Sequence, residues 1–177
     1  MRLFIAIDFE KESEYLKSLQ ENLHFQDSKL IFSKTFHLTL KFIGQVTPDR
    51  AEKIKESLNS IKTKKFHTFL DSIGAFPGES YIRVVWVGLN PKGSTLQLQK
   101  SIDTILSPSF KKEKDFKAHV TLARVKFVED KANFVKMLRD IRVEKRKIEV
   151  TEFLLVKSEL KPTGPIYTTI AKFQLLS

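Results

Sequence analysis

The sequence predicts an α+β fold of two pseudo-symmetric lobes, in which antiparallel-rich sheets are flanked by helices and a cleft separates the lobes. Three observations support this fold class. Segments of period-2 hydrophobic alternation are interspersed with segments of helical periodicity along the chain. The pattern His-x-Thr-Leu occurs twice, at His37 and at His119, in a chain with only four histidines. Each copy follows the first predicted helix of its half, so we interpret the chain as an internal duplication.

The first part of the chain predicts a strand, a helix and a loop. Residues 2–9 are a short apolar run of strand length. Residues 12–24 have helical periodicity. Their apolar face consists of Tyr15, Leu16, Leu19 and Leu23. Residues 25–34 are interpreted as a loop with a short apolar insert.

The first motif lies in a predicted strand over residues 35–44, and a helix follows it. Thr47 and Pro48 mark the start of this helix, because a hydroxyl can cap the N-terminus and proline fits the first helical position. The apolar face of the helix consists of Ala51, Ile54, Leu58 and Ile61. Residues 65–73 predict another strand, which a turn at residues 74–78 closes.

The second half repeats this order of elements. Residues 81–89 predict a strand, and a turn at residues 90–94 leads into a helix with Ser94 as its cap. The apolar face of this helix consists of Leu98, Ile102 and Ile105. The helix ends before Pro108, and a lysine-rich loop over residues 110–115 precedes the second motif.

Three strands and a helix complete the chain. The second motif lies in a predicted strand over residues 116–127, and Asp130 opens the helix that follows. The apolar face of this helix consists of Phe134, Leu138 and Ile141. A long strand over residues 146–156 and a last strand over residues 166–175 follow. No linker or low-complexity tract divides the chain, so residues 1–177 are predicted to form one bilobal domain.

Each motif places its histidine and threonine on one face of a strand, because side chains alternate with a period of two. His37 and Thr39 share a face in the first copy, and His119 and Thr121 share one in the second. The opposite, apolar faces consist of Phe36, Leu38, Leu40 and Phe42 in the first copy and of Val120 and Leu122 in the second. If the two strands lie side by side, two imidazoles and two hydroxyls meet at the cleft.

This set of groups is suited to hydrolysis of a phosphodiester. The unperturbed pKa of histidine, about 6.5, lets a neutral imidazole accept a proton from water while a protonated one donates a proton to the leaving oxygen. Threonine hydroxyls can donate hydrogen bonds to the non-bridging oxygens, where negative charge grows. Neither motif carries a cysteine or carboxylate, so no metal site and no cofactor is expected. A single His-x-Thr strand is more often structural, but the second copy favours catalysis.

The composition favours an anionic partner. The chain has 31 Lys and Arg against 21 Asp and Glu, and the formal net charge of +10 points to nucleic acid or, alternatively, to a solvated lysine-rich surface. The absence of cysteine excludes disulfides, thiolate nucleophiles and thiolate metal sites. No stretch approaches the ~18 apolar residues of a membrane span. We therefore expect a cytoplasmic protein without a membrane partner, and nothing in the sequence demands more than a monomer.

The residues around both motifs resemble the 2H phosphoesterases, and most closely the bacterial RNA 2′,3′-cyclic phosphodiesterase family, also named 2′-5′ RNA ligase. The opening strand at residues 2–8 and the block at residues 36–44 are similar to those of the family. Further similar segments follow in the family's order at residues 74–77, 83–88 and 118–124, Ser158-Glu159-Leu160, Gly164 and Tyr167. Two segments depart from the family pattern: Ala118 replaces a frequent proline, and residues 30–34 lack a frequent aromatic–proline stretch.

The resemblance implies metal-free hydrolysis of a terminal 2′,3′-cyclic phosphate of RNA to a 2′-phosphate. It implies that His37 is the proton donor to the 3′-oxygen and that His119 is the proton acceptor from water; the residues alone leave this order open. Thr39 and Thr121 would hold the phosphate. The resemblance also suggests Arg124 as a phosphate contact. Strict alternation puts Arg124 on the core face, and a β-bulge would bring it back to the face of the histidine.

The remaining polar candidates are a lysine and two further histidines. On strict alternation Lys41 shares a face with His37 and Thr39, where it either contacts the RNA backbone or is a solvated lysine. His24 and His67 have no matching threonine and are interpreted as structural.

Three other functions stay open on the sequence. Ligation, the reverse reaction, joins the cyclic end to a 5′-hydroxyl and is expected as a side activity, because water is in excess. A small cyclic phosphate is a second possible substrate, although the net charge favours longer RNA. A non-catalytic RNA-binding module is the third, and the intact histidine and threonine of both motifs argue against it.

Overall fold

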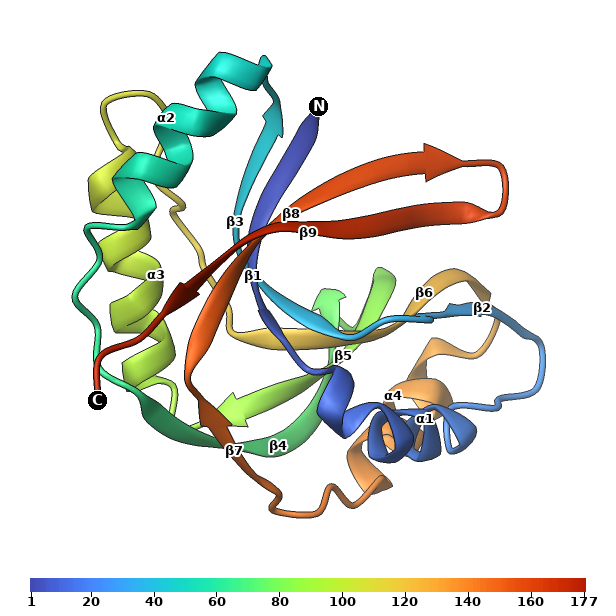
Figure 1. The fold of residues 1–177 in the computed structure, drawn as a ribbon. Helices are drawn as coiled ribbons and strands as arrows, with labels where there is room; N and C mark the ends of the chain where they lie inside the picture. The colour runs from blue at the N-terminus through green and yellow to red at the C-terminus, as the bar shows by residue number, and fades with distance from the viewer.

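The computed structural model describes residues 1–177 and contains two antiparallel β-sheets (Figure 1). The first sheet has the strand order β3 (His37–Gln45), β1 (Arg2–Asp8), β8 (Glu152–Lys161) and β9 (Gly164–Gln174). The second has the order β2 (Ser28–Phe32), β6 (His119–Val128), β5 (Ile82–Asn90), β4 (Phe66–Pro77) and β7 (Lys147–Val150). Neighbouring strands are antiparallel throughout both sheets, which confirms the predicted α+β class.

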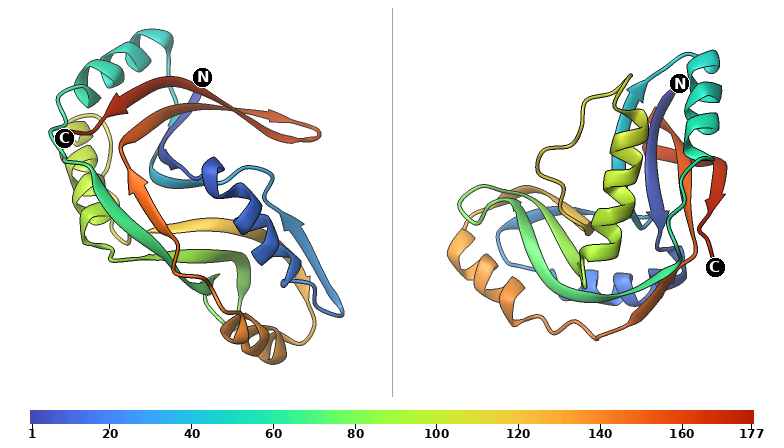
Figure 2. Two further views of the ribbon diagram at one scale, coloured as in Figure 1. Left: turned by 60° about the horizontal axis from the view of Figure 1, so that its bottom comes forward. Right: turned by 90° about the vertical axis from the view of Figure 1, so that its left-hand side faces the viewer.

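Four α-helices and one short 3-10 helix flank the sheets. They are η1 (Glu10–Glu12), α1 (Ser13–Glu21), α2 (Pro48–Leu58), α3 (Gly93–Leu106) and α4 (Lys131–Asp140). Figures 1 and 2 show α2 and α3 side by side at one end of the molecule, with α3 against β3, whereas α1 and α4 contact β6 and β4 of the second sheet. None of these helices has the length and apolar character that crossing a bilayer requires.

Each of the two sheets combines strands from both halves of the chain. In the first sheet, β1 and β3 of the first half continue into β8 and β9 of the second half. In the second sheet, β5 and β6 of the second half continue into β4 of the first half. Each motif strand therefore pairs with the opening strand of its own half, β1 or β5, which in turn pairs with a strand of the other half. This arrangement fits the predicted pseudo-twofold relation.

The hydrophobic core lies between the sheets and the helices and is rich in phenylalanine. One continuous cluster of buried side chains joins the helices to both sheets, and Phe9, Phe36, Phe134 and Phe153 are among its largest fully buried members. A small separate cluster on the first sheet consists of Phe4, Ala6, Leu154 and Val156, with Tyr167 packed against it. The first sheet therefore has an apolar surface on both faces, and the smaller cluster lies beside His37.

The predicted helix starts at Thr47 and Asp130 are confirmed. The Thr47 side chain accepts a hydrogen bond from the backbone N–H of Arg50, and Pro48 is the first residue of α2. The Asp130 carboxylate accepts one from the backbone N–H of Asn133 at the start of α4. Both side chains accept hydrogen bonds from backbone N–H groups that have no acceptor within the first turn of a helix.

The predicted loop over residues 25–34 is wrong, because Ser28–Phe32 forms β2 at the edge of the second sheet. Its side chains alternate between half-buried and exposed, but two polar residues are followed by three apolar ones, so the sequence lacks the alternation by which a strand is recognised. Its strand character comes from pairing with β6, in which Ile31 lies opposite Arg124. A pairing over such a sequence distance is invisible to local pattern analysis.

Three further element boundaries also differ from prediction. Residues 74–78 do not close a strand, because β4 continues through them as far as Pro77. Ser94 does not cap α3, which begins at Gly93 without a side-chain cap. The predicted strand over residues 146–156 is two strands, β7 and β8, which belong to different sheets and are separated at Thr151. The chain changes sheet there while staying extended, so the hydrophobic pattern shows no break.

Candidate active site

The structure brings the two motif histidines together although they belong to different sheets. His37 is the first residue of β3 and His119 is the first residue of β6, and these two strands contact each other. The two rings are close enough for the charge of His119 to contribute to the lowering of the pKa of His37. Both histidines are partly buried, as are Thr39 and Thr121. The two imidazoles therefore lie near each other, and Thr39 and Thr121 follow them on the same two contacting strands.

Each motif strand contains a β-bulge at the leucine of its His-x-Thr-Leu segment. In β3, Thr39 pairs with Ala6 and Lys41 pairs with Ile5, so Leu40 is an additional residue. In β6, Thr121 pairs with Trp86 and Ala123 with Val85, so Leu122 is additional in the same way. A bulge reverses the alternation of every residue that follows it.

The bulge at Leu122 resolves the position of Arg124. With one additional residue after Thr121, Arg124 lies on the same face as His119 and its side chain is exposed. The equivalent position of the first copy is occupied by Phe42, which is 67% exposed. The prediction that Phe42 belongs to the core is therefore wrong, and the physical reason is the bulge at Leu40.

The prediction that Lys41 faces the substrate together with His37 is also wrong. The bulge at Leu40 turns the side chain of Lys41 into the interior, where it is 1% exposed. Its ammonium group lies 2.5 Å from a carboxylate oxygen of Asp103 on α3 and 2.6 Å from the backbone carbonyl oxygen of Lys111. Lys41 is thus neither a contact for RNA nor a solvated lysine.

The ring of His37 lies among apolar and aromatic groups. Its centroid is 5.0 Å from that of Phe4 and 5.1 Å from that of Tyr167. Burial lowers the pKa of His37 from 6.5 to about 4, because the charged imidazolium loses hydration. Asp8, which pairs with His37 across the β1–β3 ladder, acts in the opposite direction, since its negative charge favours the protonated ring.

The ring of His119 has a comparable aromatic environment with one additional contact. It lies 4.8 Å from the ring of Phe76 and 6.2 Å from that of Trp86, centroid to centroid. Its Nδ1 atom is 2.6 Å from the backbone carbonyl oxygen of Lys117. Burial lowers the pKa of His119, and the Lys117 carbonyl partly offsets this effect. Because a carbonyl only accepts hydrogen bonds, Nδ1 carries the proton, and Nε2 of the neutral ring has a free lone pair.

Several residues of this site were not identified as site residues from the sequence. Asp8 and Lys117 act through a cross-strand pairing and a backbone carbonyl, for which the sequence offers no local signal. Trp86 and Tyr167 occur only in segments that resemble the family. The indole of Trp86 packs so tightly on Gly74 that a Cβ atom there would lie 2.3 Å from the ring, which explains the glycine.

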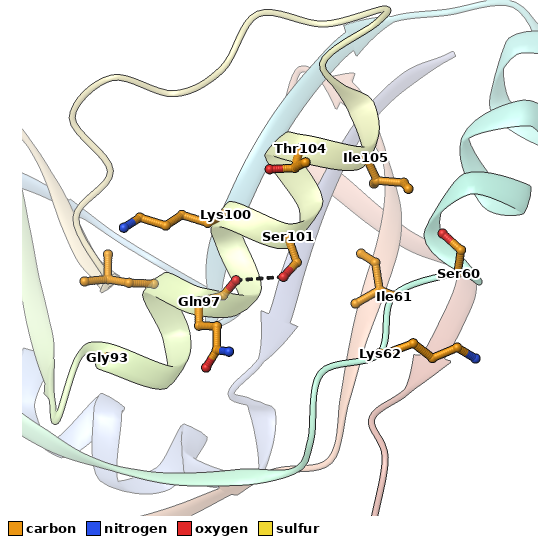
Figure 3. A pocket seen from close by; sticks show the side chains of 10 residues that line it. Ser60, Ile61, Lys62, Gly93, Gln97, Lys100, Ser101, Thr104 and Ile105 are labelled. Atoms are coloured by element: carbon orange, nitrogen blue, oxygen red, sulfur yellow. Dashed lines mark hydrogen bonds between the residues drawn. The ribbon is translucent and has the colours of Figure 1, made fainter.

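Other polar features lie apart from the two histidines. His24 is exposed near the end of α1, and His67 is exposed on β4 and lies 4.0 Å from Glu149. No group of three or more His, Cys, Asp or Glu side chains is arranged as a metal-binding cluster. A hollow of about 640 Å³ between α3 and the segment after α2 is lined by polar side chains, among them Lys62 and Lys100, and by three apolar ones, and neither motif lines it (Figure 3).

Comparison with known proteins identifies relatives that match nearly the whole chain. The sequence profile of LigT-like phosphoesterases matches twice, over residues 7–86 and 87–167, in agreement with an internal duplication. An RNA 2′,3′-cyclic phosphodiesterase of Methanocaldococcus jannaschii is 38% identical and covers 98% of this chain and 100% of its own length. A similarly named protein of Archaeoglobus fulgidus is 32% identical, again over 98% of this chain and all of its own.

Solved structures show the same fold. A protein of Thermus thermophilus superposes with a TM-score of 0.78 at 29% identity, covering 99% of this chain and 98% of its own. Escherichia coli LigT complexed with 3′-AMP also has a TM-score of 0.78, at 24% identity and with the same coverage of both chains. At that identity the second likeness concerns the fold alone.

Proposed function

The chain belongs to the LigT-like phosphoesterase family, and from this premise we propose that it hydrolyses 2′,3′-cyclic phosphate ends of RNA to 2′-phosphates by acid–base catalysis with two histidines. The observation that carries the mechanism is the convergence of His37 and His119 from two identically bulged strands. The name shared by relatives that match over the full chain supports the substrate class.

The proposed reaction moves two protons and exchanges one P–O bond for another. His119 accepts a proton from water through Nε2 as the water oxygen forms a bond to phosphorus. The bond between phosphorus and the 3′-oxygen breaks, and protonated His37 donates its proton to this oxygen. The products are a 2′-phosphate and a 3′-hydroxyl, and the histidines return to their starting states by proton exchange with solvent.

The order of acid and base is supported by the neighbours of the two rings. The Lys117 carbonyl at 2.6 Å keeps the proton of neutral His119 on Nδ1, which leaves Nε2 as the acceptor that a base needs. Asp8 lies across the strand ladder from His37, where its charge favours the protonated state that an acid needs. No comparable carboxylate stands opposite His119, whose cross-strand partner is Gly88.

Substrate binding supplies the charge that the acid requires. Burial lowers the pKa of both histidines, so both rings are neutral at pH 7 in the free protein. A cyclic phosphodiester carries one negative charge, and an opposite charge at contact distance raises the pKa of an imidazole. In this proposal Thr39 and Thr121 donate hydrogen bonds to the non-bridging oxygens, and Arg124, on the same face of β6 as His119, adds a positive charge.

The test is product analysis of a short RNA that ends in a 2′,3′-cyclic phosphate, with EDTA present. The wild-type protein is expected to form the 2′-phosphate, and His37→Ala and His119→Ala are expected to lose this turnover while keeping RNA binding. His24→Ala is a matched control, since this exposed histidine lies outside both motifs. Unchanged turnover in either motif variant would refute the two-histidine mechanism, and a 3′-phosphate product would refute the assignment of the leaving oxygen.

The net charge of +10 supports an RNA strand over a mononucleotide as substrate. Each phosphate that a protein neutralises adds affinity that weakens with salt, with a slope of roughly −0.7 per contact on a logarithmic plot for single strands. The KM of an oligonucleotide is therefore expected to rise more steeply with salt than that of a cyclic mononucleotide. Equal salt dependence of both substrates would instead favour a small cyclic phosphate.

A further inference from the structure

The loop over residues 107–118 connects α3 to the strand that carries His119 and contains no regular secondary structure (Figure 2). Irregular loops are ordinarily mobile, because few of their backbone groups are bonded within the protein. This loop is an exception, since side chains from other elements bind it at several points. Arg50 of α2 donates to the Ser109 carbonyl oxygen at 3.1 Å, and its guanidinium lies 4.7 Å from the centre of the Phe110 ring.

A buried ion pair holds the middle of the loop. The Lys41 ammonium binds the Lys111 carbonyl oxygen at 2.6 Å in addition to the Asp103 carboxylate. The second carboxylate oxygen of Asp103 accepts from the backbone N–H of Glu113 at 2.8 Å and from the side-chain amide of Gln99 at 2.8 Å. Lys41 and Asp103 are 1% and 5% exposed. The pair thus binds one carbonyl and one N–H of the loop, two residues apart.

A buried ion pair is often not needed for the stability of a fold. Removing two charges from water is costly, and replacement of buried ion pairs by apolar side chains of similar size is often neutral or stabilising. The bulged strand does not require the lysine either, because the second copy of the motif forms the same bulge with Ala123 at the equivalent position. A separate role for the pair is indicated by what it connects.

The pair connects both motif strands to the loop. Lys41 is part of β3, which carries His37, and the loop that it binds ends at His119. The Lys117 carbonyl, which fixes the proton of His119, lies in this loop four positions after Glu113. The ammonium of Lys117 also lies 5.3 Å from the centre of the Phe76 ring, the nearest aromatic neighbour of His119.

We infer that Lys41 and Asp103 are positioning residues for His119, which fix the loop so that the Lys117 carbonyl holds the base in the tautomer with a free Nε2. This inference rests on the proposed function in assigning His119 as the base. Neither residue touches the substrate, so binding stays intact when the pair is lost. The loss falls on the chemical step, because the ring of His119 then populates the other tautomer and other orientations.

The decisive variant is Lys41→Met/Asp103→Leu, which replaces the pair by apolar side chains and leaves no unpaired charge. Its kcat is expected to fall by about 10- to 100-fold, the range for a small misplacement of a catalytic group, while KM changes less than threefold. The control is Lys55→Met/Glu52→Leu, which removes an exposed ion pair of 2.7 Å on α2 and is expected to keep wild-type kcat. A double variant with wild-type kcat, or with a rise in KM alone, would overturn the inference.

A second readout needs no turnover and therefore separates this inference from the proposed function. The ¹⁵N chemical shifts of the His119 ring at pH 8 report which nitrogen carries the proton. The wild-type protein is expected to show the Nδ1–H form, and the double variant a mixture. A wild-type spectrum with the proton on Nε2, or an unchanged spectrum in the variant, would refute the positioning role even if the RNA substrate were correct.

Two further variants exclude a merely structural explanation. In a His119→Ala background the double substitution is expected to cause no additional loss of residual activity, because the residue that it positions is gone. Glu113→Pro removes the N–H that Asp103 binds and leaves the Lys41–Asp103 pair in place, so it tests the tether should the double variant fail to fold. It is expected to lower kcat and to mix the His119 tautomers in the same direction, and wild-type values for both would contradict the inference.

Discussion

The pKa of His37 makes a quantitative prediction about the stability of the protein. In the native state burial lowers this pKa from 6.5 to about 4. Between these two pH values the unfolded chain holds a proton on His37 that the native chain does not. Stability rises with pH wherever the unfolded state binds more protons, so the contribution of His37 is fully present above pH 6.5 and is lost as the pH falls towards 4.

The magnitude follows from the two pKa values. Each pKa unit corresponds to about 1.36 kcal/mol, so the loss approaches ~3.4 kcal/mol below pH 4. At pH 5 the unfolded ring is almost fully protonated and the native ring is almost fully neutral, and the loss is about 2 kcal/mol. Such a change is a large fraction of the 5–15 kcal/mol that is typical of a folded domain.

The assay is urea unfolding of wild type and His37→Asn at pH 7.5 and at pH 5. Asparagine has no proton to gain, so the free energy of unfolding should fall by about 2 kcal/mol more in wild type than in the variant. The difference between the two pH effects cancels any constant cost of the substitution. His24→Asn, at an exposed histidine, should behave as wild type. Equal pH effects in wild type and His37→Asn would refute the buried, neutral state of this ring.

Three further predictions concern the site. Both limbs of the pH profile of kcat/KM should lie below pH 6.5, because burial lowers the pKa of both histidines in the free protein. The limbs of the kcat profile should lie at higher pH, because the bound anion raises both pKa values. Arg124→Met should raise KM about tenfold or more through loss of a charge-assisted hydrogen bond, whereas Lys126→Met, at the next exposed position of β6, should not. Gly74→Ala should displace Trp86, and it should therefore destabilise the protein by about 1–3 kcal/mol and lower kcat. Gly78→Ala, where a Cβ atom would meet open space, should have neither effect. Urea unfolding measures the stability, and steady-state kinetics measure kcat.

The convergence of the two histidines was predictable because it depends on periodicity and repetition. His37 and His119 each precede an apolar alternation of strand type, and a repeated segment in a duplicated chain is expected to occupy equivalent places. The same periodicity gave the wrong face for the residues that follow the leucine of the first motif. Strict alternation has no means to show a bulge, so Lys41 was placed with the substrate instead of in the interior. For Arg124 alternation and resemblance disagreed, and the structure contains the β-bulge that would reconcile them.

The groups that orient the histidines were not predictable, because they act through pairing and through the backbone. Asp8 reaches His37 only by the register of β1 on β3, and Lys117 acts by its carbonyl oxygen, which every residue possesses. The ion pair of Lys41 with Asp103 joins residues 62 positions apart. The strand β2 is defined by its partner β6 and not by its own pattern. In each case the missing information is a long-range contact, which a local pattern does not contain.

On the proposed mechanism, the differences between the two copies of the motif determine which histidine is the acid and which is the base. Two identical imidazoles in identical surroundings would share a proton equally, and neither would be committed as acid or base. Here the residue opposite His37 is Asp8 and the residue opposite His119 is Gly88, so negative charge is present beside only one ring. The Lys117 carbonyl fixes the tautomer of the other ring, with the proton of the neutral form on Nδ1. The repeated strands therefore bring equal groups together, and on the proposed mechanism the neighbours that differ between the copies make His119 the acceptor of the proton from water and His37 the donor to the leaving oxygen.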